Sequence, residues 1–208
     1  MISTPTFTRH AASFAAALAC FGIAGCGSLL GPSNPPPQIY RLSPQMPSRA
    51  EGAAATWQLA VARPDASQSL DTDRIALARG SVMDYYADAQ WSDSTPRLVQ
   101  SLLVQAFDSS GRVQAGTRES SLRADLTLTS ELHDFEAQYD STDAAPTVVV
   151  DVQAKLLDSR GEVIASLDSR QTQRATQNSV ASVVEAFDGA ATAALAQIVG
   201  WTVQATPH

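Results

Sequence analysis

The sequence predicts an α/β (α+β) sandwich, in which two main helices pack on one mixed, largely antiparallel sheet of about five to six strands. Two periodicities support this class. Several short segments alternate apolar and polar residues, which is typical of strands with one face on a core. Two longer segments repeat apolar residues every three or four positions, which is typical of amphipathic helices. No internal repeat is visible, so the pattern predicts one domain.

Four short strands are predicted in the first half of the domain. Residues 38–43 contain two apolar positions, and residues 57–62 alternate large apolar side chains as far as the breaker Pro64. Arg74–Arg79 alternates as well, and residues 82–86 follow a Gly-Ser turn.

The first helix is predicted to begin at Thr95–Pro96, with threonine as the N-cap and proline in the first turn. Ser109–Ser110–Gly111 ends it. Its apolar face comprises Leu98, Leu102, Leu103, Ala106 and Phe107.

Three adjacent antiparallel strands are predicted in the second half. Residues 122–129 alternate, with a continuation through Leu132 and Phe135, and residues 136–146 form an acidic connection. Residues 148–156 and 163–170 are strands joined by a turn at Asp158–Ser159–Arg160–Gly161, where glycine accepts a positive φ.

The last helix is predicted from a cap at Asn178 or Ser179 to Gly200. We therefore place the single folded domain at residues 38–202 and a tail at residues 203–208. The apolar stripe of the helix comprises Val180, Val183, Val184, Phe187, Ala191, Ala194 and Ile198.

The N-terminus predicts a bacterial lipoprotein precursor. Residues 1–25 combine one arginine with a short apolar run, which is typical of a secretory signal peptide. The run ends Ile-Ala-Gly-Cys at Cys26, whose thiol would carry the lipid, and residues 26–37 form a lipidated cysteine and a proline-rich spacer. The alternative is an Ala-rich buried helix that happens to contain a cysteine.

Residue Gly27 indicates the target membrane. Lipoproteins that stay in the inner membrane usually carry aspartate after the lipidated cysteine, so glycine favours the periplasmic face of the outer membrane in a Gram-negative bacterium. Several acyl chains give a firm anchor, since one chain alone is marginal. Cys20 would be removed with the leader, which leaves no thiol for a disulfide.

The charge argues against a nucleic-acid partner. The chain has 14 Lys and Arg against 21 Asp and Glu, a net charge of −7, and no basic stripe that could neutralise phosphates. The sequence contains no nucleophile elbow, phosphate loop, paired-His metal motif or dinucleotide turn. We therefore expect no catalytic residues, no metal and no cofactor.

Three weaker features remain. His133 beside Asp134 is either a general base with its orienting carboxylate or, as we favour, a solvated polar pair, because neighbours in a strand point to opposite faces. Asp71–Thr72–Asp73 is either a weak divalent-metal pair or, as we favour, a turn bonded to its own backbone. Three aromatic residues either line a groove for a ligand or partner or belong to the core and its edge: Tyr85, Tyr86 and Trp91.

A series of short segments between Tyr40 and Trp201 follows the order of features of a known family. These segments are Tyr40–Arg41–Leu42, residues 70–75, Tyr85–Tyr86, Trp91, Ser94–Thr95–Pro96, Leu132, Phe135, residues 154–158, residues 186–188 and residues 198–201. In them the chain resembles the auxiliary lipoproteins of ABC-type transport systems, the paraquat-inducible protein C-like family. The resemblance implies helices on a mixed sheet similar to the anticodon-binding-domain class, without a cofactor. It also implies transport of lipids or other hydrophobic compounds between membranes with an MCE-domain (mammalian cell entry) protein.

We therefore expect a non-enzymatic auxiliary lipoprotein of an ABC/MCE-type transporter, whose oligomeric state is open, a homo-oligomer included. One alternative is an assembly factor for another envelope complex. The other is a lipid-anchored envelope hydrolase that uses His133.

Overall fold

The computed structural model describes residues 36–47, 54–120, 124–141 and 144–206. The chain divides into two compact units, residues 1–36 and residues 37–208, and every described helix and strand belongs to the second. In chain order the elements are β1 (Gln38–Tyr40), β2 (Gln58–Val61), β3 (Asp65–Ala66), β4 (Arg74–Arg79), β5 (Val82–Trp91), α1 (Thr95–Ser110), β6 (Gln114–Thr117), β7 (Leu126–Tyr139), β8 (Thr147–Leu157), β9 (Val163–Arg174) and α2 (Val180–Ala205).

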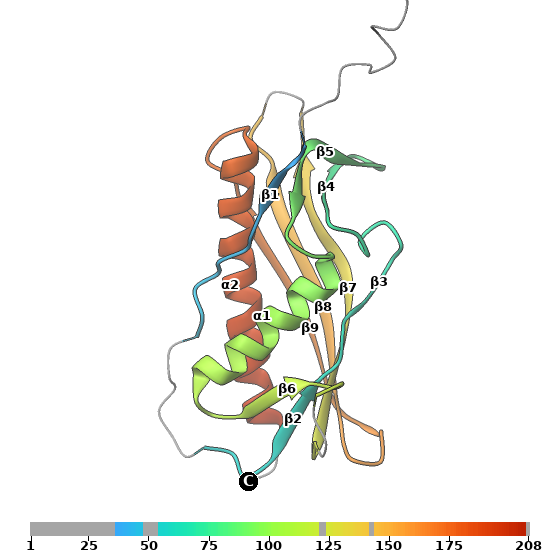
Figure 1. Cartoon of the computed structure of the whole chain (residues 1–208), viewed down its shortest axis with the longest axis vertical. Coiled ribbons are helices and arrows are strands. Elements are labelled where there is room, and N and C mark those ends of the chain that lie inside the picture. Colours follow the sequence, from blue (N-terminus) through green and yellow to red (C-terminus); the bar gives the residue numbers. More distant parts are fainter. Residues whose placement is uncertain (1–35, 48–53, 121–123, 142–143, 207–208) are drawn as a thin grey trace, which may run out of the picture. The chain divides into compact units, whose positions relative to one another are not determined.

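Strand β7 organises the sheet. Along one edge eleven of its 14 residues pair antiparallel with β8, and β9 continues antiparallel beyond β8. Along the other edge it pairs in succession with the parallel strands β2, β3 and β4. Strand β6 extends the sheet beyond β2, and β5 and then β1 extend it beyond β4 (Figure 1). The sheet is therefore mixed, and its long pairings are antiparallel.

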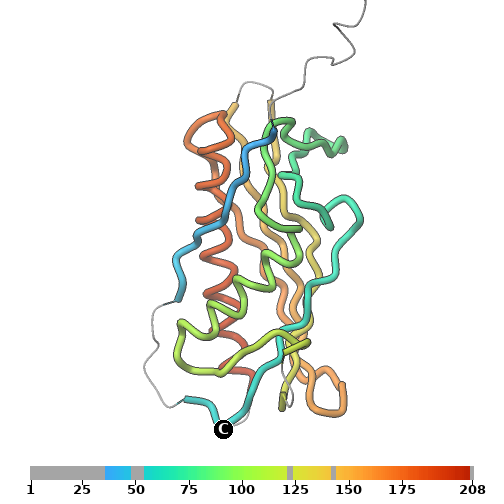
Figure 2. Tube along the Cα trace, in the orientation of Figure 1, coloured from blue at the N-terminus to red at the C-terminus, as the bar shows by residue number. Residues whose placement is uncertain are grey.

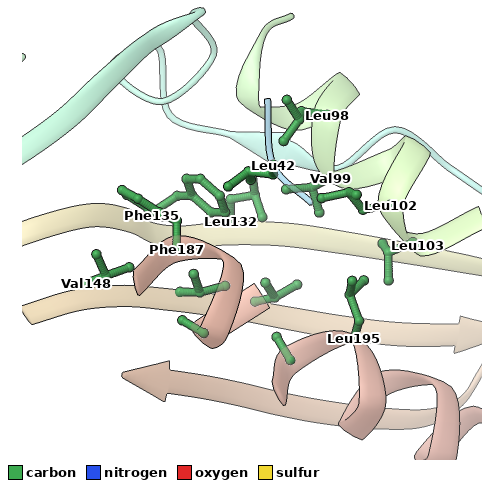
Figure 3. Close-up of a cluster of buried hydrophobic side chains, with 14 of the residues drawn as sticks. Leu42, Leu98, Val99, Leu102, Leu103, Leu132, Phe135, Val148, Phe187 and Leu195 are labelled. Carbon is green, nitrogen blue, oxygen red and sulfur yellow. The ribbon is translucent and has the colours of Figure 1, made fainter. Parts of the chain in front are cut away.

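Both helices pack on the same face of the sheet. Helix α2 lies over β8 and β9, and α1 contacts α2, β2 and β6 (Figure 2). The inner face of the long strands is apolar, as the alternation predicts: Val148, Val150 and Val152 of β8 are each at most 2% exposed. With Phe187 and Leu195 of α2 they form the core (Figure 3).

The predicted mixed α+β architecture, the two helices and the three adjacent antiparallel strands are confirmed, and the likeness to the anticodon-binding-domain class stays a prediction. The strand count was too low, because the described sheet has nine strands rather than five to six. Strands β3 and β6 have two and four residues, which is too short for alternation to be visible.

Several predicted boundaries were wrong. Strand β5 continues to Trp91 rather than ending at Tyr86. Strand β7 begins at Leu126 and includes Glu136–Tyr139, which the prediction assigned to a connection. Helix α2 passes through Gly200 and continues to Ala205, because one glycine costs only about 1 kcal/mol and Val199 and Thr202 on either side are buried.

The helix ends are capped by backbone and hydroxyl groups. Ser94, not Thr95, is the N-cap of α1, and the Thr95 hydroxyl instead donates to the Thr72 carbonyl at 3.1 Å. Gly111, with φ +62°, ends α1 and donates its N–H to the Asp108 carbonyl. Ser179 caps α2 by accepting a hydrogen bond from the Ser182 N–H.

By length and composition α2 is long and apolar enough to cross a bilayer. More than half of its most apolar stretch is buried inside the domain. A long apolar helix that is largely buried is typical of a domain core, so α2 is a core element.

Candidate functional site

Trp91 belongs to the core. It is 1% exposed, and its indole meets the rings of Phe135 and Phe187 edge-on, at centroid distances of 6.2 and 5.1 Å. Of the two interpretations offered for this residue, the structure therefore supports core packing, and in this conformation the indole does not line a surface groove.

The two tyrosines are half-buried and hold neighbouring segments together. The Tyr85 hydroxyl donates to the Ser69 carbonyl at 2.9 Å, and the guanidinium of Arg74 lies 3.8 Å from the centre of its ring. The hydroxyl of Tyr86 bonds to that of Tyr139 at 2.8 Å. Burial, followed by the bond to Tyr139, raises the pKa of Tyr86 well above its ordinary value. Both phenols therefore have partners within the domain.

His133 and Asp134 do not form an acid–base pair. His133 lies where the pairing of β7 with β8 is bulged between Leu132 and Asp134. Its ring nitrogens are 3.8 Å from Glu131 and 4.0 Å from Asp151, which is longer than a hydrogen bond. Asp134 accepts instead from Arg170, at 2.6 Å.

Arg170 joins the strands across the outer face of the sheet, which is the face away from the helices. Its guanidinium donates to Asp151 and to Asp134, both at 2.6 Å, and these bonds raise the pKa of Arg170. Because the guanidinium bonds to Asp134 and Asp151, and Glu131 lies beyond hydrogen-bond distance of the imidazole, the cluster is a structural ion network.

The Asp71–Thr72–Asp73 segment is a bend, and its aspartate side chains do not bond to its own backbone as the favoured interpretation expected. Asp71 forms an ion pair with Arg63 instead, and it is the Thr72 hydroxyl that accepts from a backbone N–H, that of Arg74. The Asp73 carbonyl accepts from the Trp91 N–H. Across the part of the chain that the structure describes, no three His, Cys, Asp or Glu side chains are grouped to hold a metal ion.

A surface groove of about 380 Å³ lies beside the first half of α1. Its lining comes from the segments that follow β1 and β5 and from α1, and it is more polar than apolar. Arg41 and Asp93 bring opposite charges to it. The lining residues are Arg41, Leu42, Ser92, Asp93, Leu98, Ser101, Leu102 and Gln105.

Leu102 also borders a small apolar cavity of about 20 Å³ between the two helices and the sheet (Figure 3). That volume is close to the space of one water molecule, so the interior holds no ligand-sized cavity there. Of the described cavities, the groove is the one with the size of a ligand or peptide site. The groove could not be predicted from the sequence, because residues 41–42 and residues 92–105, which line it, are about 50 residues apart in the chain.

The predicted lipidation residue, Cys26, lies outside the described residues. The described domain begins at the end of the spacer, and β1 follows directly at Gln38.

The fold is a two-layer α+β domain shared with solved proteins. A crystal structure of a Xanthomonas campestris protein of the family DUF330 is 26% identical, has a TM-score of 0.75, and matches over 81% of this chain and 95% of that one. A second crystal structure, of an uncharacterised protein, has a TM-score of 0.61 at 14% identity, over 82% and 98% of the two chains.

Residues 40–199 match the family model described as ABC-type transport auxiliary lipoprotein component. The chain belongs to this family of auxiliary lipoprotein components of ABC-type transport, which confirms the predicted resemblance. An uncharacterised protein of Bradyrhizobium diazoefficiens is 31% identical over 187 residues, which are 88% of this chain and 50% of that protein. The chain thus spans about half the length of this curated relative.

Proposed function

We propose that this protein is a non-enzymatic lipoprotein held by Cys26 on the periplasmic face of the outer membrane of a Gram-negative bacterium. There it serves an ABC/MCE-type system that moves lipids or other hydrophobic compounds between the two membranes. The observation that carries the proposal is the family match over residues 40–199, which runs from the end of β1 almost to the end of α2.

The mechanism would be positional. A lipid anchor and a short proline-rich spacer confine the domain near the membrane and so raise its effective concentration at a partner in the same envelope. The spacer residues 27–37 reach about 30 Å when extended at about 3.1 Å per residue. The anchor therefore limits how far the domain travels while leaving it free to dock.

The ion network on the outer face supports a non-enzymatic role. A hydrolase that used His133 would need a carboxylate to orient the imidazole and a bound water or nucleophile within reach. The neighbouring Asp134 is occupied by Arg170 at 2.6 Å, and the His133 ring is itself 45% exposed.

We place the partner contact at the groove beside α1. A groove that combines leucine side chains with hydroxyl, amide and oppositely charged groups suits an extended peptide segment, which presents both side chains and backbone polar groups. The wall at Arg41 follows β1 directly, so the groove lies close to the residue at which the tether enters the domain.

The anchor is tested by Cys26→Ala. We expect the variant to keep its leader and to disappear from the outer-membrane fraction, while Cys20→Ala, which changes only the leader, is processed normally. Normal maturation and outer-membrane fractionation of Cys26→Ala would refute the anchor.

The partner is tested by in-cell photo-cross-linking from residue 101 on the groove wall, with the same probe at residue 159, in the hairpin turn between β8 and β9, as the matched control. Recovery of an MCE-domain protein from position 101 and not from 159 supports the proposal. Recovery of an outer-membrane barrel protein would support the assembly factor instead. A partner captured equally from both positions would refute the groove as the contact.

A further inference from the structure

Strand β9 is a long, open edge of the sheet. In the described part of the chain it pairs with β8 alone, over 12 residues, and it contains neither proline nor glycine. The strands at the other ends of the sheet, β1 and β6, have three and four residues. Short edge strands are one of the ways in which proteins avoid unwanted pairing, and β9 does not have this protection.

The charges on β9 form a self-complementary pattern. Asp168 and Arg170 stand two residues apart, so they share the outer face of the sheet. Both are held in place: Asp168 accepts from the Gln153 amide at 3.1 Å, and Arg170 donates to Asp134 and Asp151. Ser169 lies between them on the inner face and is fully buried.

We propose that β9 pairs antiparallel with β9 of a second copy of this chain, about a two-fold axis at Ser169. Asp168 of each copy then lies opposite Arg170 of the other, and opposite charges across two strands are stabilising. An axis at Asp168 or at Arg170 would instead place like charges opposite each other. Parallel in-register pairing would set every charge against its own copy. An axis at Gln171 would also set Asp168 opposite a charge of the other sign, Arg174, but it would pair only residues 168–174, whereas the axis at Ser169 pairs residues 164–174. The charge pattern and the length of the pairing together therefore select one register.

Helix α2 provides a second contact on the same side. Its Gln197 side chain accepts hydrogen bonds from Ser169 at 2.8 Å and from Gln171 at 2.7 Å, so this side of the helix adjoins the β9 edge. A methyl group built on Gly189 would lie 3.2 Å from the side chain of Gln173, also in β9. Four of the seven exposed residues of α2 are small, namely Ala181, Gly189, Ala193 and Ala196, and the other three are Glu185, Gln197 and Gln204.

Small side chains allow the two α2 helices to come close together. Paired edge strands lie about 4.8 Å apart, and helices that each cover the last two strands of their own sheet then meet at roughly the 8–10 Å of ordinary helix packing. The strand edge and the helix face thus form one continuous surface that fits a second copy.

A paired-cysteine experiment tests the register. Ser166 and Thr172 are exposed on the outer face and lie directly opposite each other in the proposed pairing. Opposed residues have Cα atoms about 4.5–5.5 Å apart, within the range of a disulfide. The full chain carrying Ser166→Cys/Thr172→Cys is oxidised in the cell envelope with copper–phenanthroline and run on a non-reducing gel. We expect a covalent dimer in most of the protein.

The matched control is Ser166→Cys/Arg174→Cys, whose cysteines face each other only if the axis lies at Arg170. It should give little dimer, as should the wild-type chain and each single variant. The proposal is overturned if the first pair remains monomeric while its thermal unfolding matches wild type. It is also overturned if the control pair cross-links equally well.

A charge reversal gives an independent measure. Asp168→Arg places arginine opposite Arg170 at both ends of the interface and should raise the dimer dissociation constant about tenfold or more, measured by sedimentation of the purified full chain in detergent. Asp108→Arg, the same change on exposed α1, should leave it unchanged. An Asp168→Arg protein that folds and dimerises as tightly as wild type would refute the proposed contact.

Discussion

Truncation of Phe187 tests how α2 is attached to the sheet. Its ring is fully buried, stacks on Phe135 at a centroid distance of 4.9 Å and meets Trp91 edge-on at 5.1 Å. Phe→Ala in a core costs about 3–5 kcal/mol, and each aromatic pair contributes about 0.5–1.5 kcal/mol within that total. We expect Phe187→Ala to lower the free energy of unfolding by about 4 kcal/mol, a large part of the 5–15 kcal/mol typical of a domain.

Urea unfolding followed by tryptophan fluorescence measures this loss, since Trp91 lies against the deleted ring. The control is Val163→Ala, because Val163 is 54% exposed and its truncation should change stability by about 0.5 kcal/mol or less. A loss below about 1 kcal/mol for Phe187→Ala, with an unchanged dependence on urea, would mean that α2 does not pack on the sheet as described.

Two further predictions concern polar groups. The Ser130 hydroxyl is buried with no hydrogen-bond partner, so Ser130→Ala should raise the free energy of unfolding by about 1 kcal/mol. Thermal melts measure this change. A lower free energy of unfolding in the variant would show that the hydroxyl has a hydrogen-bond partner in the folded protein. Burial raises the pKa of Asp188 above its ordinary 3.8, although its carboxylate accepts from the Ser43 N–H. The folded state therefore binds this proton more tightly than the unfolded state, and the contribution of Asp188 to stability falls as the pH rises from 3.8 to the raised value. Asp188→Asn keeps an acceptor and should remove that decline, and an unchanged pH profile of the melting temperature would contradict the assignment.

The long helices and strands could be predicted well from the sequence. The predictions were wrong where the pairing of strands changes direction or register. The rule that neighbours in a strand point to opposite faces would separate His133 from Asp134. In the structure, a bulge between Leu132 and Asp134 brings both residues beside Asp151 on the outer face. A bulge depends on how β8 pairs with β7, and a strand's own residues do not reveal it.

The aromatic residues of β5 illustrate a second limit. The strand passes from an exposed start at Val82, 63% exposed, to a buried end at Trp91, 1% exposed. Tyr85 and Tyr86 lie between and are half-buried. A strand that changes from surface to core along its length has no single alternation, so sequence spacing could not separate a groove from a core in this segment.

The edge position of β9 has a compositional basis that becomes clear beside β8. Both strands alternate, and both place one face under α2. The inner face of β8 is valine at 148, 150 and 152, whereas the inner face of β9 carries Ser169, Gln171 and Gln173 over the same region. A central strand buries its inner side chains between neighbouring strands on both sides. An edge strand has a neighbour on one side only, so polar side chains on its inner face can reach the helix that covers it. Ser169 and Gln171 bond to Gln197 of α2 in this way. Polar residues on the helix-covered face of an otherwise regular strand therefore indicate an edge, and on β9 they coincide with the surface that fits a second copy.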